Sequence, residues 1–306
     1  MSRRREPRKS RKKLAYGIIA VILILAVSFL AYSFLPSSPP QVAIVDQLSS
    51  IPGQQDPTFV NACISILEGS GLTWAYYNGT KVTVNFYRKL PSYGTSLIIL
   101  RVHSAIMKTA EGIVSILGLF TSERYSSEAA EKYPEDVDDH RLVEAFFSDE
   151  ERQQGISYFG IVPSFINKSM EGKFKDTIII MMGCEGLGYE GQEYSDMAEA
   201  FVAKGAKVFI GWNGPVSINH TDLATVNLLQ SLISDKRRIK EAVDQTNYDV
   251  GQDPTYNSTL NYYPGTPDVE NYAIPNLKGT LTINVAYPSP ALRPKTLTKS
   301  KYMVHS

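Results

Sequence analysis

The chain has 306 residues, of which 43% are hydrophobic and 20% are charged, and its formal net charge is zero. This balance is typical of a folded protein and excludes a chain that is disordered throughout. Nucleic-acid binding depends on clustered positive charge, and an overall neutral chain gives no indication of it, so we expect no nucleic-acid partner.

The first 35 residues have the pattern of a membrane anchor. Residues 1–13 hold eight basic residues and one acidic residue, and residues 14–35 carry no charge. A helix of this length reaches about 33 Å at about 1.5 Å per residue, enough to cross a hydrocarbon core of about 30 Å. The basic block precedes the apolar stretch, so the positive-inside rule keeps the N-terminus cytoplasmic and places the body outside. We therefore predict a single-pass protein that contacts the lipid bilayer through residues 14–35, with a cleaved signal peptide as the alternative.

The sequons and the cysteines bear on the environment of the body. Four N-x-Ser/Thr sequons, as expected of an extracytoplasmic glycoprotein, begin at Asn78, Asn167, Asn219 and Asn257. Two cysteines are too few for a disulfide framework, although one Cys63–Cys184 bridge is possible. Cys63 shares helical spacing with Phe59 and Leu67, which predicts a buried cysteine on a helix face.

A Pro-rich linker at residues 36–40 leads into a body in which apolar strands alternate with helices. The predicted strands cover residues 42–45, 72–77, 82–87, 96–102, 177–182 and 207–211. The predicted helices cover residues 57–68, 193–204, 221–234 and 235–246. Continuous apolar strands between helices are typical of a parallel sheet covered on both faces. We therefore predict one α/β domain over residues 41–250.

Two segments do not follow this rhythm. Residues 122–152 are acidic and polar, with a helix expected over 141–147, and they form either a solvated surface or a loop that closes over a substrate. Residues 251–306 are rich in Tyr, Asn, Pro and Thr, with a strand expected over 277–287 and a loose tail from residue 295. This C-terminal extension is either an edge addition to the sheet or a small appended unit.

Two of the predicted strands are followed by side chains that can take part in nucleophilic catalysis. The strand over 96–102 is followed by His103, and the strand over 177–182 is followed by Gly183 and Cys184. Ligands of open parallel sheets bind beyond the carboxyl ends of the strands, so both side chains would emerge at one edge. An imidazole that takes the thiol proton generates the reactive thiolate. The pattern predicts a Cys–His pair, with buried structural roles for both residues as the alternative.

Metal and nucleotide sites are not indicated. His140 and His220 are expected at the surface, and four scattered histidines with one well-placed cysteine make no metal site. Residues 186–191 match the G-x-G-x-x-G dinucleotide fingerprint. That site would need an acidic residue at the end of the next strand, where this chain has Gly211, Trp212 and Asn213. We expect no cofactor.

The stretch around Cys184 has further distinctive features. After the strand TIIIMM come the turn Gly-Cys-Glu-Gly, a helix containing Ala198–Phe201, the sequence Lys-Gly-Ala at 204–206, and a strand that ends near a Trp. Residues 176–213 thereby resemble the caspase-like superfamily of cysteine peptidases, and are most similar to its gingipain and CHAT branch. The resemblance covers residues 41–250, is fair over 96–104 and is weak across the insertion. It implies a caspase-like fold and an extracytoplasmic cysteine endopeptidase acting on polypeptides.

The resemblance also implies roles for individual residues. Cys184 would be the nucleophile and His103 the general base, and the backbone N–H groups of Cys184 and Ser104 would form an oxyanion hole. Many members of the superfamily have Gly where this chain has Ser104, so a substrate carbonyl could approach less closely. The substrate pocket would be lined by residues at strand ends: Asp46, Trp212, Asn213 and Glu185.

Several of these assignments have alternatives. An acidic Asp46 at the pocket floor would favour Arg or Lys before the cleaved bond, whereas a capping or turn role is the simpler one for this residue. Trp212 could equally belong to the core. A catalytically inactive caspase-like module that binds a partner is the rival to the peptidase, motivated by Ser104 and by the unassigned C-terminal extension. Transfer of the acyl group to another amine is a third possibility.

Overall fold

The computed structural model describes residues 39–108, 114–189 and 191–274, together with the single residue Tyr16. The chain divides into two compact units, Met1–Pro39 and Pro40–Ser306, and every described strand lies in the second. The predicted span at residues 14–35, apart from Tyr16, and the predicted strand at 277–287 lie outside the described residues. Within the described part, no helix combines the length and apolar character needed to cross a bilayer.

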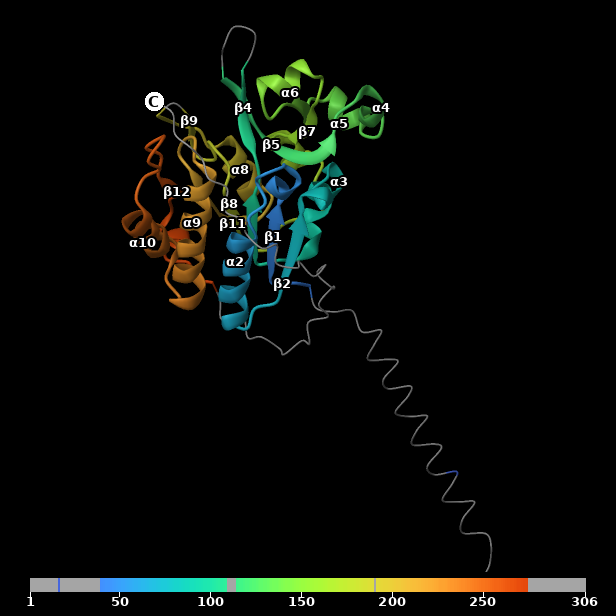
Figure 1. Ribbon diagram of the computed structural model, residues 1–306. Helices are drawn as coiled ribbons and strands as arrows, with labels where there is room; N and C mark the ends of the chain where they lie inside the picture. The colour runs from blue at the N-terminus through green and yellow to red at the C-terminus, as the bar shows by residue number, and fades with distance from the viewer. Residues whose placement is uncertain (1–15, 17–38, 109–113, 190, 275–306) are drawn as a thin grey trace, which may run out of the picture. The chain divides into compact units, whose positions relative to one another are not determined.

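A six-stranded sheet forms the centre of the body (Figure 1). Its spatial order is β12-β11-β8-β3-β1-β2. Five strands run parallel: β1 (Val42–Asp46), β2 (Trp74–Asn78), β3 (Leu97–Arg101), β8 (Thr177–Met181) and β11 (Ala206–Trp212). Strands β1, β3 and β8 are buried along their whole length, as their continuous apolar runs predict.

The sixth strand corrects the expectation of a wholly parallel sheet. Strand β12 (Leu260–Tyr263) pairs antiparallel with β11, so the sheet is mixed. It comes from the segment beyond residue 250, which therefore adds an edge strand to the sheet, one of the two alternatives for that segment.

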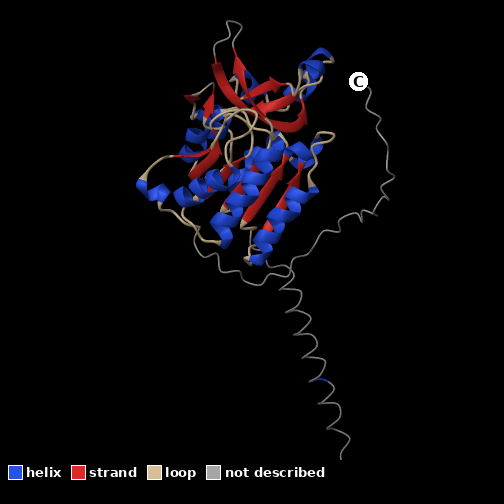
Figure 2. Cartoon of the chain, turned by 60° about the vertical axis from the view of Figure 1, so that its left-hand side comes forward, coloured by secondary structure: helices blue, strands red, loops and turns tan. Residues whose placement is uncertain are grey.

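Helices cover both faces of the sheet, as predicted (Figure 2). The helices that pack on one face are α2 (Pro57–Gly69), α9 (Ile218–Leu229), the π-helical turn η4 (Gln230–Ser234), α10 (Ile239–Val250) and α11 (Pro267–Glu270). The helices that pack on the other face are α3 (Val84–Lys89), α7 (Pro163–Lys168) and α8 (Asp196–Ala203). Helix α2 begins where the Asp56 carboxylate accepts the N–H groups of Thr58 and Phe59, and Cys63 on this helix is fully buried, as its spacing predicts.

Short 3-10 turns connect several elements. They are η1 (Gln47–Ser50), η2 (Gly79–Lys81) and η3 (Leu90–Tyr93). The strand predicted over residues 82–87 is wrong, because α3 forms there instead. Thr83 caps this helix by accepting the Phe86 N–H, and Val84 and Tyr87, three residues apart, share its buried side. The alternating sequence VTVNFY imitates a strand, but capping and burial favour a helix.

A second sheet covers the α3 side of the body, at the top of Figure 1. It is antiparallel, in the order β4 (Ser104–Lys108), β5 (Val114–Arg124), β7 (Tyr158–Ile161) and β6 (Leu142–Ala145). The helix predicted over residues 141–147 is therefore wrong, because residues 142–145 pair with β7. Short helices α4 (Ser127–Ala130), α5 (Pro134–Asp138) and α6 (Asp149–Gln153) lie between these strands, and a two-stranded hairpin, β9 (Gly188–Tyr189) with β10 (Gln192–Glu193), follows β8.

Candidate active site

The predicted site residues all lie at the carboxyl edge of the six-stranded sheet. Asp46 is the last residue of β1, His103 follows β3, Cys184 follows β8, and Trp212 is the last residue of β11. Strands β3 and β8 are hydrogen-bonded neighbours, so the turns that carry His103 and Cys184 are adjacent. This is the edge at which open α/β sheets bind their ligands.

The two turns are tied together through Ser104. Its hydroxyl donates a hydrogen bond of 2.7 Å to the carbonyl oxygen of Cys184, and the residue is 3% exposed. Gly183 completes the contact, since a Cβ there would lie 2.4 Å from Ser104 Oγ and 2.7 Å from the Val102 carbonyl oxygen. Ser104 thus holds the backbone of Cys184 in place, through a contact that a glycine at position 104 could not make.

The Cys184 thiol is half-buried and contacts the loop before α9. The Val216 N–H donates to Sγ at 3.4 Å, and the thiol lies 3.7 Å from the Val216 carbonyl oxygen. Burial raises the pKa of Cys184 above its ordinary value, although the Val216 N–H opposes this shift. In this conformation the sulfur is a protonated thiol at neutral pH. Both cysteines of the chain are free.

His103, on the turn after β3, lies among aromatic rings. Its ring centroid is 4.7 Å from that of Phe120 and 5.4 Å from that of Phe147. Burial lowers the pKa of His103 to about 4, so the imidazole is neutral at pH 7, as a general base must be. The His103 backbone N–H donates to Gln47 Oε1 at 3.0 Å.

The turns that carry the predicted pair are adjacent, but the two side chains have different surroundings: Cys184 packs against the core on the α2 and α9 side, and His103 contacts Phe120 and Phe147. Among the hydrogen bonds of the described residues, none links the His103 imidazole with Cys184, whose sulfur contacts Val216 instead. Catalytic hydrogen bonds in unliganded enzymes are often long and tighten only when substrate binds.

Glu185, directly after Cys184, has a left-handed backbone with φ of 62°. Its N–H donates to the Gly214 carbonyl oxygen at 2.9 Å, which fixes the turn. Non-glycine residues in this region are uncommon and concentrate at functional sites.

Asp46 is enclosed instead of lining an open pocket. Its carboxylate accepts hydrogen bonds from Arg101 Nη1 at 2.9 Å, from the Tyr76 hydroxyl at 2.9 Å and from the Ser49 N–H at 3.2 Å. Asp46 and Arg101 are each 1% exposed. Asp46 therefore has the capping role that was its simpler interpretation, and a substrate arginine would have to displace Arg101 to reach it.

Arg101 is a central residue that sequence reasoning missed. It makes a bidentate pair with Asp222 of α9, with Nε to Oδ1 at 2.8 Å and Nη2 to Oδ2 at 3.0 Å, and it lies over the Phe59 ring. Burial raises the pKa of Asp222 even though Arg101 opposes this. The only signal in the sequence is a single arginine inside the apolar run SLIILRV.

Trp212 and Asn213 have different surroundings. Trp212 is 1% exposed and donates from Nε1 to Thr221 Oγ1 at 2.9 Å, which is the core role left open above. The Asn213 amide pairs with Thr259, and this residue also lines a groove of about 520 Å³. That groove lies between the β9–β10 hairpin and β12, and Leu187, Gln192 and Tyr262 also line it. Of the four predicted pocket residues, Asn213 is the one beside this groove.

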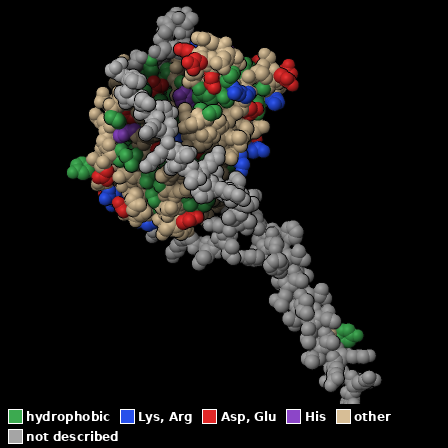
Figure 3. Space-filling view, in the orientation of Figure 1, with side chains coloured by type: hydrophobic (Ala, Val, Ile, Leu, Met, Phe, Trp, Pro, Cys, Tyr) green, Lys and Arg blue, Asp and Glu red, His purple; other side chains and the backbone are tan. Residues whose placement is uncertain are grey.

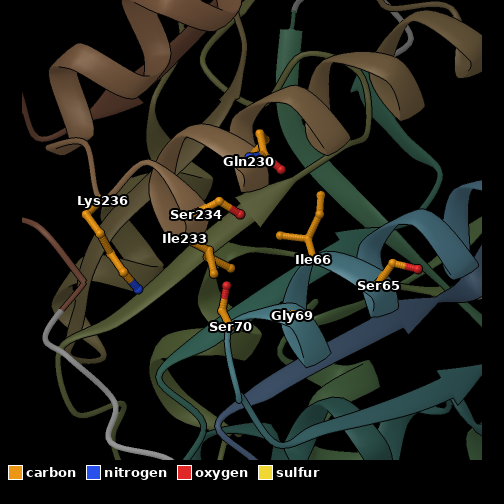
Figure 4. Close-up of a pocket in the computed structure, with 8 residues that line it drawn as sticks. All are labelled: Ser65, Ile66, Gly69, Ser70, Gln230, Ile233, Ser234 and Lys236. Atoms are coloured by element: carbon orange, nitrogen blue, oxygen red, sulfur yellow. The ribbon is translucent and has the colours of Figure 1, made fainter.

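Another depression, of about 580 Å³, lies away from these residues (Figure 4). It is formed by the C-terminal part of α2 and by η4, and Ser70 on its rim precedes β2, so it belongs to the amino edge of the sheet.

On the face shown in Figure 3, acidic and basic side chains of the described residues are interspersed.

Comparison with known proteins adds no family to this description. The chain matches no protein-family model and no curated protein. In the described ranges, no group of three or more His, Cys, Asp or Glu side chains is arranged to hold a metal ion.

The raised pKa of Cys184 predicts a characteristic pH dependence of alkylation. Only the thiolate reacts with iodoacetamide, so the rate should be low at pH 7 and rise about tenfold per pH unit to beyond pH 9. Cys63, whose pKa burial raises to about 12, should stay unlabelled in the folded protein, and a Cys63→Ala variant isolates the Cys184 signal. A rate that is already constant between pH 6 and pH 8 would instead mean a preformed thiolate–imidazolium pair.

Proposed function

We propose that the chain is a membrane-anchored, extracytoplasmic cysteine endopeptidase of caspase-like type, with Cys184 as nucleophile and His103 as general base. The observation that carries this proposal is the position of the two residues after neighbouring parallel strands, on turns joined by the hydrogen bond from Ser104 Oγ to Cys184 O. The resemblance over residues 176–213 supports it independently. Anchoring through residues 14–35 rests on the sequence pattern. All four sequon asparagines are exposed, as glycosylation requires.

The proposed reaction is acyl transfer to sulfur and then to water. Cys184 Sγ attacks the carbonyl carbon of the scissile amide while the thiol proton passes to the His103 imidazole. The C–N bond then breaks, His103 returns the proton to the leaving amine, and a thioester remains on Cys184. Water hydrolyses this thioester and restores the thiol.

Backbone N–H groups would stabilise the intermediate oxyanion. Ser104 faces Leu119 of β5, and the Phe120 N–H donates to the His103 carbonyl oxygen, which makes Ser104 and Leu119 a non-hydrogen-bonded pair. The Ser104 N–H therefore points away from β5, and it lies on the turn that contacts Cys184. The N–H groups of Ser104 and Cys184 are the donors that we propose for the oxyanion.

Attack requires the thiol to leave Val216. The proposal requires rotation about the Cα–Cβ bond of Cys184, from one staggered rotamer to another, that exchanges the weak Val216 contact for one with His103. This change costs one hydrogen bond to sulfur, and a bound substrate could offset it. The neutral imidazole of His103 is ready to take the proton at pH 7.

Labelling with two acyl-oxymethyl-ketone probes tests the proposal, one bearing Arg and one bearing Asp at P1. We expect an adduct on Cys184 of the full chain, located by mass spectrometry, that is lost in Cys184→Ala and His103→Ala and kept in Cys63→Ala. Because the Asp46 carboxylate is already paired with Arg101, we expect the two probes to react at similar rates. A strong preference for the Arg probe would support a basic P1 residue and an acidic pocket floor.

An inactive caspase-like binding module is the second candidate, and the contact of the Cys184 thiol with Val216 favours it. In that case neither probe would label a folded chain whose thiol iodoacetamide still alkylates at high pH. Products that carry a new amide bond would identify the third possibility, acyl transfer to an amine.

A further inference from the structure

Strand β4 begins one residue after His103 and is an edge strand of the four-stranded sheet. It is hydrogen-bonded to β5 on one side only. Because Ser104 and Leu119 are a non-hydrogen-bonded pair, Ala105 bonds to Gly118 of β5, while the backbone groups of Ser104 and Ile106 point outward. Apart from the β4–β5 ladder, the hydrogen bonds of the described residues include none to the backbone of Ile106.

The first four residues of this edge carry no charge, proline or bulge that would prevent strand addition. Natural edge strands carry charged residues, prolines or bulges that prevent another chain from pairing. The sequence from Ser104 to Met107 is Ser-Ala-Ile-Met, without charge or proline, and the ladder becomes irregular only between Met107 and Lys108. The unprotected edge is therefore short and lies directly beside the candidate active site.

We propose that β4 binds an extended segment of the polypeptide substrate as an added strand, with the backbone of Ile106 as its pairing partner. This inference rests on the peptidase proposed above and names how that site recognises its substrate. The edge is continuous with the site, since Ser104 contacts Cys184 through its hydroxyl and directs its N–H outward. Outward groups of alternate residues lie about 7 Å apart along a strand. A substrate whose scissile carbonyl meets the Ser104 N–H can therefore pair through a nearby residue with Ile106, as in other cases of strand addition.

Two features of recognition follow. Main-chain hydrogen bonds would supply the affinity, so the substrate must be extended and unfolded at the cleaved segment. Substrates too short to reach Ile106 would lose this contribution, whereas the chemistry at Cys184 would remain.

A proline at position 106 removes the outward N–H without removing a ladder bond to β5, and edge strands tolerate proline in that arrangement. The reference is Ile106→Ala, which loses the same side chain but keeps the N–H. On reduced, carboxymethylated casein, we expect kcat/KM to be about tenfold lower for Ile106→Pro than for Ile106→Ala, the effect of one lost hydrogen bond. On a short acyl-amide substrate, the two variants should be equal.

The opposite edge of the same sheet provides a matched control. Leu142 and Ile161 are a non-hydrogen-bonded pair, since the Val162 N–H donates to the Arg141 carbonyl oxygen, so the Glu144 N–H also points outward from its strand. Glu144→Pro makes the same backbone change at the other edge of the sheet, and its reference is Glu144→Ala, since both variants lose the hydrogen bond from Ser157 to the Glu144 carboxylate. These two variants should hydrolyse casein at equal rates.

Further measurements separate failure of this inference from failure of the peptidase. Equal casein hydrolysis by Ile106→Pro and Ile106→Ala would overturn the role of β4 and leave the peptidase standing. If the wild-type chain hydrolyses nothing, fluorescence anisotropy with labelled carboxymethylated casein decides: weaker binding by Ile106→Pro than by Ile106→Ala supports β4, and equal binding overturns it. Should the proline variant not fold, a scan of N-methylated peptides on the wild-type chain is the test. Loss of cleavage at alternate residues supports strand addition, and uniform tolerance overturns it.

Discussion

Replacing Arg101 with methionine is expected to lower the free energy of unfolding by about 3–5 kcal/mol, the usual cost of leaving a buried charge without its partner. Arg101 is 1% exposed and pairs with Asp46 and Asp222 together. Without the guanidinium, both carboxylates would remain inside the protein, and Asp222 would lose both of its hydrogen bonds to Arg101. Asp46 would keep its bonds from Tyr76 and Ser49.

Asp222→Asn is the comparison that tests this explanation. It removes one of two carboxylates and leaves a one-to-one pair between Arg101 and Asp46, so it should cost clearly less than Arg101→Met. Denaturant unfolding of the purified chain, followed by the fluorescence of Trp74 and Trp212, measures both. A loss below about 1 kcal/mol for Arg101→Met would mean that the cluster is not the closed network described above.

The pH dependence of the Arg101→Met deficit gives a second check. Burial raises the pKa of Asp222 even beside Arg101, and loss of the guanidinium raises this pKa further, so the destabilising effect is largest where the unfolded carboxylate is ionised, near pH 7. As the pH falls, Asp222 of the variant takes up a proton and the difference from the wild type should shrink. A deficit that stays constant from pH 7 to pH 4 would point to lost packing against Phe59 instead of charge.

The central sheet was accessible to sequence reasoning because its strands are buried on both faces. The apolar runs that became β1, β3 and β8 admit few other structures, because five consecutive buried positions are typical of a strand covered on both faces. The second sheet was not predicted, since its strands gain their stability from pairing and from packing on one face only. Residues 142–145 are a strand because β7 lies beside them, a partner that local sequence does not reveal.

For the candidate site too, the sequence predicted the positions of residues but not their long-range contacts. Strand ends and their order along the chain placed His103 and Cys184 on adjacent turns, because neighbouring strands end at one edge. The partners of each side chain depended on contacts between distant segments. Asp222 reaches Arg101 from α9, and Val216 reaches Cys184 from the loop before that helix. Such contacts decide whether Asp46 is a pocket floor or a capping residue, which the sequence leaves open, and its pairing with Arg101 was not predicted.

Gly183→Ala is expected to disrupt the site as well as the fold. A Cβ at this position would lie 2.4 Å from Ser104 Oγ and 2.7 Å from the Val102 carbonyl oxygen, and the second contact is with backbone that cannot turn aside. The turns after β3 and β8 would have to separate, at a cost of about 1–3 kcal/mol, in the range of overpacked cores. Separation would also break the hydrogen bond from Ser104 to Cys184 and move the turn that carries Cys184 away from the turn that carries His103.

Two further variants distinguish this steric effect from others. Ser104→Ala in the Gly183→Ala background removes the hydroxyl contact but not the one with Val102, so it should restore only part of the stability. Gly186→Ala, on the same turn, would bring its Cβ to 3.3 Å from the Phe209 ring and should cost less than Gly183→Ala. Unfolding free energies and the rate of Cys184 labelling by the ketone probes measure the two consequences together. If Gly183→Ala keeps both at wild-type values, the turns are not in contact at this point, and the adjacency of His103 and Cys184 loses its structural basis.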